Sequence, residues 1–150
     1  MKSAYYTAVT TNAYRHALDA ALAGEPLDPL WVEETEKCSH RPYTTGFYFG
    51  QPGQHYAEAS YSSTAEIAAV VESCDGQGNA LLTQRNKIFE NDPLELLLPD
   101  RAPIPFSAIA LFDEEGNRIP DTRRAMMPFR MQLPVPAPSG AIVRKLLEKA

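Results

Sequence analysis

The pattern of the sequence changes at residues 40–50, which read HRPYTTGFYFG. Pro42 fixes its own φ at about −65° and pushes Arg41 toward extended geometry, so no helix is expected to run through this point. The residues that follow are mostly β-branched or aromatic and favour a strand, which we expect over residues 43–49. The stretch therefore marks a predicted boundary between helical structure before it and β structure after it.

Residues 1–39 are expected to form a helical arm. Residues 4–23 are rich in alanine and contain no glycine or proline, which favours a helix. Ser3 suits the N-cap of that helix, and Gly24 suits the left-handed position that follows its end. A second, short helix is predicted to begin at Pro29. The apolar face of the first helix is wide, which indicates that it packs against something larger.

Residues 40–150 are expected to form a mainly β domain. Short apolar segments alternate with turn residues at intervals of about ten residues, which is typical of a small closed or nearly closed β-barrel. The clearest hairpin has its loop at residues 75–79. Beyond residues 43–49, the predicted strands are 66–74, 80–84, 94–98, 106–112, 126–133 and 141–144.

Composition restricts the class of protein. The 150 residues carry a net charge of −5, so the chain as a whole does not attract nucleic acid or an anionic membrane, although a local basic face is compatible with that total. The length suits one domain with an appendage. Cys38 and Cys74 do not have metal-ligand or redox spacing. We expect a cytoplasmic chain with no metal site, no secretory signal and no membrane span.

No nucleophile motif, phosphate-binding loop, paired-histidine motif or cysteine cluster is present in the sequence, so we expect no catalytic residues. His40 suits a substrate contact, but a role in tying down a linker through a backbone carbonyl is favoured. Arg41 can bind a carboxylate or phosphate as a fork, or form a salt bridge with the acidic arm.

The aromatic residues of the predicted strand have two interpretations. Tyr43, Phe47, Tyr48 and Phe49 would alternate across a strand, so we expect at least two in the core and the others on a face suited to a peptide or a base. Residues 85–87, with Arg41, suit a small basic patch or a solvated strand end. The candidates for substrate binding or anchoring are His40, Arg41, Tyr43, Thr44, Thr45, Tyr48, Arg85, Asn86 and Lys87.

Residues 39–50, SHRPYTTGFYFG, resemble a motif of the collagenase-like peptidase family U32. Residues 84–87 followed by 92–96 resemble a segment of that family's C-terminal domain, and residues 113–117 resemble its acidic hairpin. Residues 1–6 are similar to a segment at the end of the catalytic region. The resemblance covers nearly the whole chain.

The resemblance implies that this chain is the C-terminal part of a larger protein. The arm would be the end of a TIM-barrel-like catalytic region, and the β domain a small closed barrel similar to elongation-factor domain 2. Family members are described as collagen-degrading peptidases, and relatives take part in prephenate-dependent hydroxylation of tRNA or ribosomal RNA. Those relatives carry an iron–sulfur cluster on four upstream cysteines. This chain lacks them, so we expect no cofactor here and allow a cluster in the full-length parent.

Three hypotheses follow. The first is a non-catalytic accessory domain that covers or extends the substrate site of a collagenase-like peptidase and contacts an extended polypeptide. The second is an RNA-contacting domain of a tRNA-hydroxylation enzyme, suggested by Arg41, Arg85 and Lys87. The third is a domain that only stabilises the catalytic barrel. The expected partners are the TIM-barrel-like region and either a polypeptide or tRNA.

Overall fold

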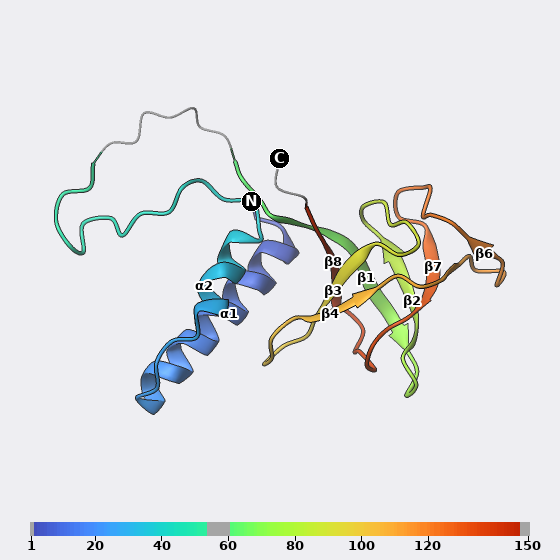
Figure 1. Cartoon of the computed structure of the whole chain (residues 1–150), viewed down its shortest axis with the longest axis horizontal. Coiled ribbons are helices and arrows are strands. Elements are labelled where there is room, and N and C mark those ends of the chain that lie inside the picture. Colours follow the sequence, from blue (N-terminus) through green and yellow to red (C-terminus); the bar gives the residue numbers. More distant parts are fainter. Residues whose placement is uncertain (1, 54–60, 148–150) are drawn as a thin grey trace.

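The computed structural model describes residues 2–53 and 61–147, which form two helices followed by an antiparallel sheet of eight strands (Figure 1). The helices are α1 (Ala4–Ala23) and α2 (Pro29–Glu36). The strands are β1 (Ala65–Cys74), β2 (Asn79–Gln84), β3 (Pro93–Leu97), β4 (Ile104–Ser107), β5 (Leu111–Phe112), β6 (Arg118–Ile119), β7 (Pro128–Gln132) and β8 (Ile142–Leu146).

The predicted helices are confirmed, with their caps. The Ser3 hydroxyl accepts a hydrogen bond from the first turn of α1, and Gly24 ends the helix with φ 71°. Asp28 caps α2 in the same way as Ser3 caps α1. The rings of His16 and Trp31 stack with centroids 3.8 Å apart, which holds the two helices together. Local signals at the helix ends were therefore sufficient to place both helices.

The order of strands in the sheet is β4-β3-β8-β1-β2-β7-β5-β6. The hairpin of β1 and β2 is confirmed, but the single strand predicted over residues 106–112 is wrong. The chain there forms β4, which pairs with β3, and then crosses to form β5, which pairs with β7. The crossing occurs at the buried Ala108, which bonds through both its N–H and its carbonyl to residues 91–92. An alternating pattern continued through this crossing, so the sequence concealed it.

The closed barrel and its likeness to elongation-factor domain 2 are not confirmed. The sheet is curled and open among the described residues, with β4 and β6 at its two edges. Residues 88–92 belong to no strand and lie between these two edge strands, where their backbone bonds to the chain that follows each of them. The N–H of Glu90 donates to the carbonyl of Pro120 at 3.0 Å, and the N–H of Asn91 donates to the carbonyl of Ala108 at 2.8 Å. Strand periodicity does not show whether the first and last strands of a sheet pair, so the sequence could not distinguish a closed barrel from an open, curled sheet.

The predicted aromatic strand is also wrong. Residues 43–49 contain no strand, and residues 46–50 form a turn in which Gly46 and Gly50 have φ of 58° and 130°. Positive φ interrupts an extended backbone and favours glycine. Phe47, Tyr48 and Phe49 are 79%, 92% and 88% exposed, and Tyr43 is also exposed, so none of the four belongs to the core.

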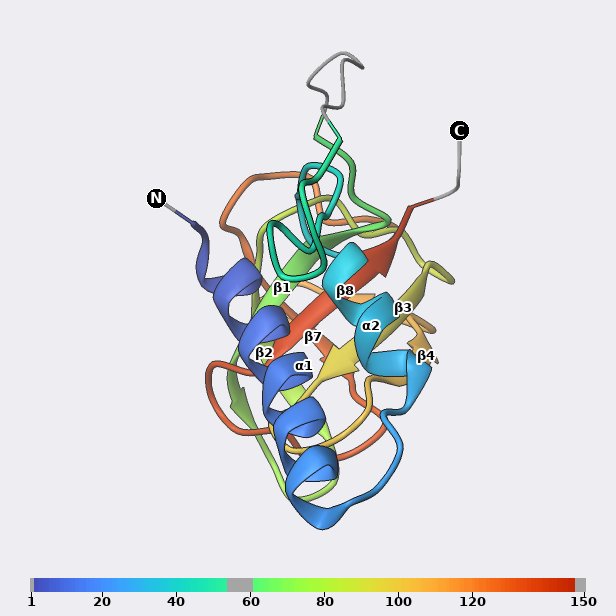
Figure 2. The same ribbon diagram turned by 90° about the vertical axis from the view of Figure 1, so that its left-hand side faces the viewer.

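The main core lies inside the curled sheet, and a second apolar cluster joins the helices to its outer side. Tyr5 and Val9 of α1 pack with Cys38 and with Ile142 of β8. Figure 2 shows both helices lying across the sheet over β8 and β3. Burial raises the pKa of Tyr5 to about 12, and its hydroxyl donates to the carbonyl of Lys37 at 2.7 Å. The arm is thus packed on the β domain and is not a free extension.

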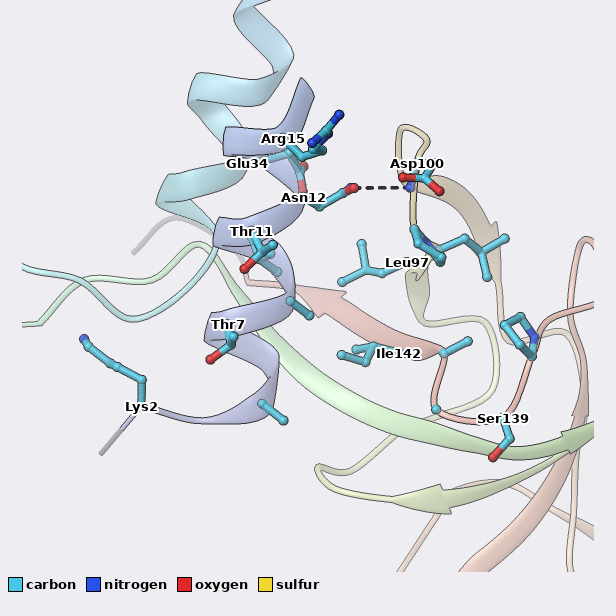
Figure 3. Close-up of a pocket in the computed structure, with 18 residues that line it drawn as sticks. Lys2, Thr7, Thr11, Asn12, Arg15, Glu34, Leu97, Asp100, Ser139 and Ile142 are labelled. Carbon is cyan, nitrogen blue, oxygen red and sulfur yellow. Dashed lines mark hydrogen bonds between the residues drawn. The ribbon is translucent and has the colours of Figure 1, made fainter. Parts of the chain in front are cut away.

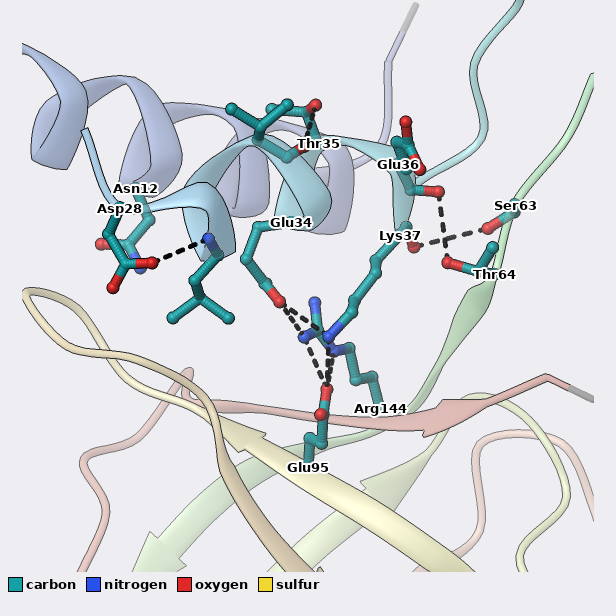
Figure 4. A network of polar contacts seen from close by, with 12 residues as sticks. Asn12, Asp28, Glu34, Thr35, Glu36, Lys37, Ser63, Thr64, Glu95 and Arg144 are labelled. Atoms are coloured by element: carbon teal, nitrogen blue, oxygen red, sulfur yellow. Dashed lines mark hydrogen bonds and ion pairs between the residues drawn. The ribbon is translucent and has the colours of Figure 1, made fainter. Parts of the chain in front are cut away.

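A buried ion network reinforces this contact (Figure 4). Arg144 of β8 is fully buried, and its guanidinium donates to Glu34 of α2 and to Glu95 of β3, each at 2.7 Å. Lys37 lies 2.9 Å from Glu34 and 3.6 Å from Glu95. Burial is the largest single effect on the pKa of Glu34 and would raise it, but the hydrogen bonds and charges of Arg144 and Lys37 together outweigh burial, and the pKa is lowered. The positive charges of Arg144 and Lys37 thus balance the negative charges of Glu34 and Glu95.

We predict that Glu34→Ala lowers the free energy of unfolding by about 3 kcal/mol, because it removes a carboxylate from a fully buried guanidinium. Urea unfolding of the purified chain measures the change. Asp19→Ala is the matched control, since Asp19 pairs with Arg15 on the exposed surface of α1 and its loss should cost less than about 0.5 kcal/mol. Equal losses in the two variants would contradict a stabilising role for the network.

Residues 85–92 are held in place by a buried threonine. The Thr122 hydroxyl accepts from the N–H of Ile88 at 2.9 Å, and the N–H of Thr122 donates to the carbonyl of Ile88 at 2.9 Å. Both side chains are fully buried, so neither backbone group of Ile88 has ready access to water. The chain after β2 is therefore fixed to the turn that precedes β7.

We predict that Thr122→Val, which keeps the shape and removes the hydroxyl, costs about 2 kcal/mol because it leaves the N–H of Ile88 buried without an acceptor. Thr83→Val is the control, since the Thr83 hydroxyl bonds only to the exposed Glu72, and its effect should stay within about 0.5 kcal/mol. Thermal or urea unfolding of both variants measures the difference. A Thr122→Val variant as stable as the wild type would refute this account.

Candidate functional site

A group of exposed cations lies where β2 ends and β7 begins. Arg85 and Lys87 directly follow β2, and Arg123 and Arg124 lie in the turn before β7. The two strands pair antiparallel, with Thr83 opposite Pro128, so the end of one adjoins the start of the other. We call Arg85, Lys87, Arg123 and Arg124 the basic cluster.

One carboxylate, Asp121, lies within the basic cluster. Its two oxygens are 3.0 Å from Lys87 Nζ and 3.0 Å from Arg123 Nε. The hydrogen bond from Lys87 and then that from Arg123 hold the pKa of Asp121 below its usual value. Four cations against one carboxylate leave three positive charges in excess. The site therefore suits a polyanion.

Two carboxylates on the chain that follows Lys87 have cations of their own and do not cancel this excess. Glu90 pairs with Arg118 at 2.7 Å, and Asp92 pairs with Lys145 at 2.6 Å. The ring of Phe89 is partly exposed, and Lys87 Nζ lies 4.6 Å from its centroid. An aromatic face thus lies next to the basic cluster.

The backbone under the basic cluster is fixed to β1. The N–H of Arg85 donates to the carbonyl of Ala68 at 2.8 Å, and Asn86 Nδ2 donates to the carbonyl of Ile67 at 2.8 Å. The Arg85 guanidinium contacts the sulfur of Met126. The Asn86 side chain thus makes a structural hydrogen bond, whereas the charged ends of Arg85 and Lys87 lie on the surface.

His40 and Tyr43 lie at the base of the loop before β1, away from β2. His40 Nδ1 is 2.8 Å from the carbonyl of Cys38, and its backbone forms an isolated bridge with Ser62. The rings of His40 and Tyr43 stack with centroids 4.5 Å apart, and the Tyr43 hydroxyl donates to the carbonyl of Thr35 at 2.8 Å. These contacts anchor the loop to the end of α2, and contact with a substrate stays a prediction.

The other predicted residues of this loop make local contacts. Arg41 lies over the ring of Tyr61, 5.0 Å from its centroid, and no ion pair with the arm is found within residues 2–53 and 61–147. The Thr44 hydroxyl accepts from the N–H of Gly46 at 3.2 Å, and the carbonyl of Thr45 accepts from the N–H of Tyr48 at 3.3 Å. Both threonines shape the turn.

A groove of about 460 Å³ lies between the arm and the start of β1, and Asn86 is the one predicted site residue among those that line it. Ser39 and Tyr6 line it on the side of the arm, and Asn86 and Ile67 line it on the side of the sheet. Sequence reasoning missed Arg123 and Arg124, although two adjacent arginines just before the strand predicted at residues 126–133 were a visible signal. What the sequence could not show is that β7 pairs with β2.

A second groove, of about 800 Å³, lies between α1 and the loops at the other end of β8 (Figure 3). Its walls are mostly apolar and include Leu97 and Ile142. Asn12 of α1 closes one side, since its Oδ1 accepts from the N–H of Asp100 at 3.3 Å. This groove lacks the excess positive charge of the basic cluster.

The structure offers no cluster for a metal ion within its described residues, since no group of three histidine, cysteine or acidic side chains comes together there. Cys38 is buried under the arm, and Cys74 lies at the end of β1. None of the described helices is both long and apolar enough to span a membrane.

The chain matches two family models. Residues 1–58 match peptidase family U32, and residues 63–144 match the peptidase family U32 C-terminal domain. The crystal structure of the C-terminal domain of a protein described as a U32 peptidase, from Geobacillus thermoleovorans, is similar in fold. Its TM-score is 0.52 at 24% identity, over 55% of this chain and 93% of that one. The β domain thus has the fold of that domain.

Two curated proteins are similar over most of the chain. The tRNA hydroxylation protein P1 of Bacillus subtilis is 28% identical over 140 residues, which are 89% of this chain and 33% of that protein. The tRNA hydroxylation protein P of Escherichia coli is 32% identical over 123 residues, 79% of this chain and 27% of that protein. The chain therefore spans a third or less of each relative's length. With both family models matched, the chain belongs to peptidase family U32 and carries its C-terminal domain.

Proposed function

We propose that this chain is the C-terminal part of a tRNA hydroxylation protein and that its β domain contacts the RNA through the basic cluster. The observation that carries the proposal is the excess of three positive charges at Arg85, Lys87, Arg123 and Arg124, in a chain whose net charge is −5. The names of the curated relatives support the same substrate class.

The basic cluster suits phosphates better than a protein carboxylate. Arginine presents a planar fork that matches phosphate oxygens, and three of the four cations are arginines. Asp121 pairs with Lys87 and Arg123 in the absence of a ligand, so an incoming phosphate competes with it for those two cations. Binding of this kind releases counterions and weakens steeply as salt rises.

The role proposed for this chain is binding and not catalysis. An iron–sulfur cluster of the four-cysteine type does not fit here, because the sequence holds only two cysteines. We propose that the cluster and the hydroxylation chemistry belong to the remaining part of a longer protein, with a TIM-barrel-like fold. The apolar residues that α1 leaves exposed, Tyr14, Leu18 and Leu22, would pack against that part.

We predict that Arg123→Ala combined with Arg124→Ala weakens binding of the chain to unmodified tRNA and reduces the slope of log affinity against log salt by about 1 to 2. Asp121→Asn should tighten binding, because it removes the one negative charge in the basic cluster. Filter binding or fluorescence anisotropy at several salt concentrations measures both. Arg101→Ala is the control, since it removes an exposed arginine outside the basic cluster. If tRNA binding is absent, or equal in all four proteins, the proposal fails.

An accessory domain of a collagenase-like peptidase is the second candidate, and the groove between α1 and β8 is the observation that favours it. Its size and apolar walls suit an extended polypeptide. On this proposal the chain binds gelatin and collagen peptides without cleaving them. Ala8→Trp, which places a large ring in the groove, should abolish that binding and leave tRNA binding unchanged. No binding of gelatin by the wild-type chain would eliminate this candidate.

A further inference from the structure

Three consecutive aromatic side chains stand almost fully in solvent. Phe47, Tyr48 and Phe49 lie between Gly46 and Gly50, and we call residues 46–50 the aromatic turn. Large apolar side chains are usually removed from water, and a contiguous exposed group of them marks an interaction site. The aromatic turn has no part in the anchoring contacts of the loop and is therefore available to a partner.

The base of the loop is held while its tip projects. His40 and Ser62 exchange two backbone hydrogen bonds, each of 3.0 Å, where the chain leaves the arm and enters the sheet. Tyr43 stacks on His40 and is bonded to α2. The Tyr48 N–H donates to the carbonyl of Thr45, which closes the turn behind the three rings. The rings are thus presented outward from a fixed base.

The charge around the aromatic turn favours an anionic partner. Residues 39–53 contain Arg41 and no aspartate or glutamate. Arg41 and Lys2 both face the ring of Tyr61, at 5.0 and 5.9 Å from its centroid. Aromatic rings beside cations, without carboxylates, are the combination with which proteins bind single-stranded nucleic acid, because bases stack on the rings while phosphates meet the cations.

The aromatic turn and the basic cluster lie on different parts of the molecule, so an RNA that binds both must span the distance between them. The loop leads into the start of β1, and Arg85 and Asn86 are bonded to Ala68 and Ile67 near that start. The groove between Ser39 and Asn86 lies at the base of the loop, and its lining includes neither the aromatic turn nor a cation of the basic cluster. In Figure 1 the described part of this loop extends away from the sheet, past the helices, whereas the chain between β2 and β3 lies among the strands on the other side of the helices.

We propose that the aromatic turn stacks on unpaired bases of the RNA whose phosphates lie on the basic cluster. This inference rests on the proposed function and adds to it the part of the RNA that is recognised, a single-stranded segment and not only a duplex backbone. Stacking is insensitive to salt, whereas phosphate contacts are not, so the two surfaces have separate experimental signatures.

The test compares Phe47→Leu/Phe49→Leu with the wild-type chain, using a short oligouridine that carries one 2-aminopurine. Leucine keeps an apolar side chain and removes the planar ring. We expect binding about tenfold weaker, loss of the fluorescence quenching that stacking produces, and an unchanged salt slope. Leu22→Ala is the control, because it removes an exposed apolar side chain near the end of α1, outside both the aromatic turn and the basic cluster, and should change nothing.

Each outcome decides the inference. If the leucine variant binds and quenches like the wild type, stacking is refuted while the basic cluster and the proposed function stand. If the wild-type chain binds neither oligouridine nor tRNA, both fall together. If the variant loses affinity and salt slope in proportion, the loop acts through charge or structure and the inference is wrong. Circular dichroism of the variant excludes unfolding, since no ring of the aromatic turn belongs to the core.

Discussion

The placement of the arm depends on the charge of Arg144. A guanidinium with no exposure to water is tolerable only when carboxylates compensate it, and those come from two different regions, Glu34 from α2 and Glu95 from β3. The ion pairs of Arg144 with Glu34 and Glu95 therefore form only when α2 packs on β3 and β8 as it does here. The network makes residues from both family models parts of one folded unit.

The elements that the sequence predicts well are those with local signals. Ser3, Gly24 and Asp28 mark the helix ends through their own side chains or φ, and the loop at residues 75–79 defines its hairpin without help from the rest of the chain. The errors arise where tertiary context decides. Residues 43–49 have strand-forming side chains but no neighbouring strand, among the described residues, with which to pair.

The residues of the candidate site also divide into those that local sequence predicts and those that only the tertiary structure brings together. Arg85 and Lys87 could be chosen from sequence because they follow a strand, but Arg123 and Arg124 join them only through the pairing of β2 with β7. The sequence predicted an exposed face for only part of the aromatic set and a core position for at least two of its members, since these residue types are those of a core strand. The charge of the basic cluster and the exposed rings of the aromatic turn together favour a nucleic acid, whereas the apolar groove along α1 is the feature that suits a polypeptide.

The open sheet has a consequence for how any ligand is held. β6 is two residues long, β4 contains Pro105, and residues 88–92 lie between the two edges and use their backbone groups on both sides. The described part of the domain thus lacks a long edge with free N–H and C=O groups, and a peptide cannot join the sheet as an added strand. Recognition must come from side chains, so the surface can change its ligand by substitution without any change in the fold.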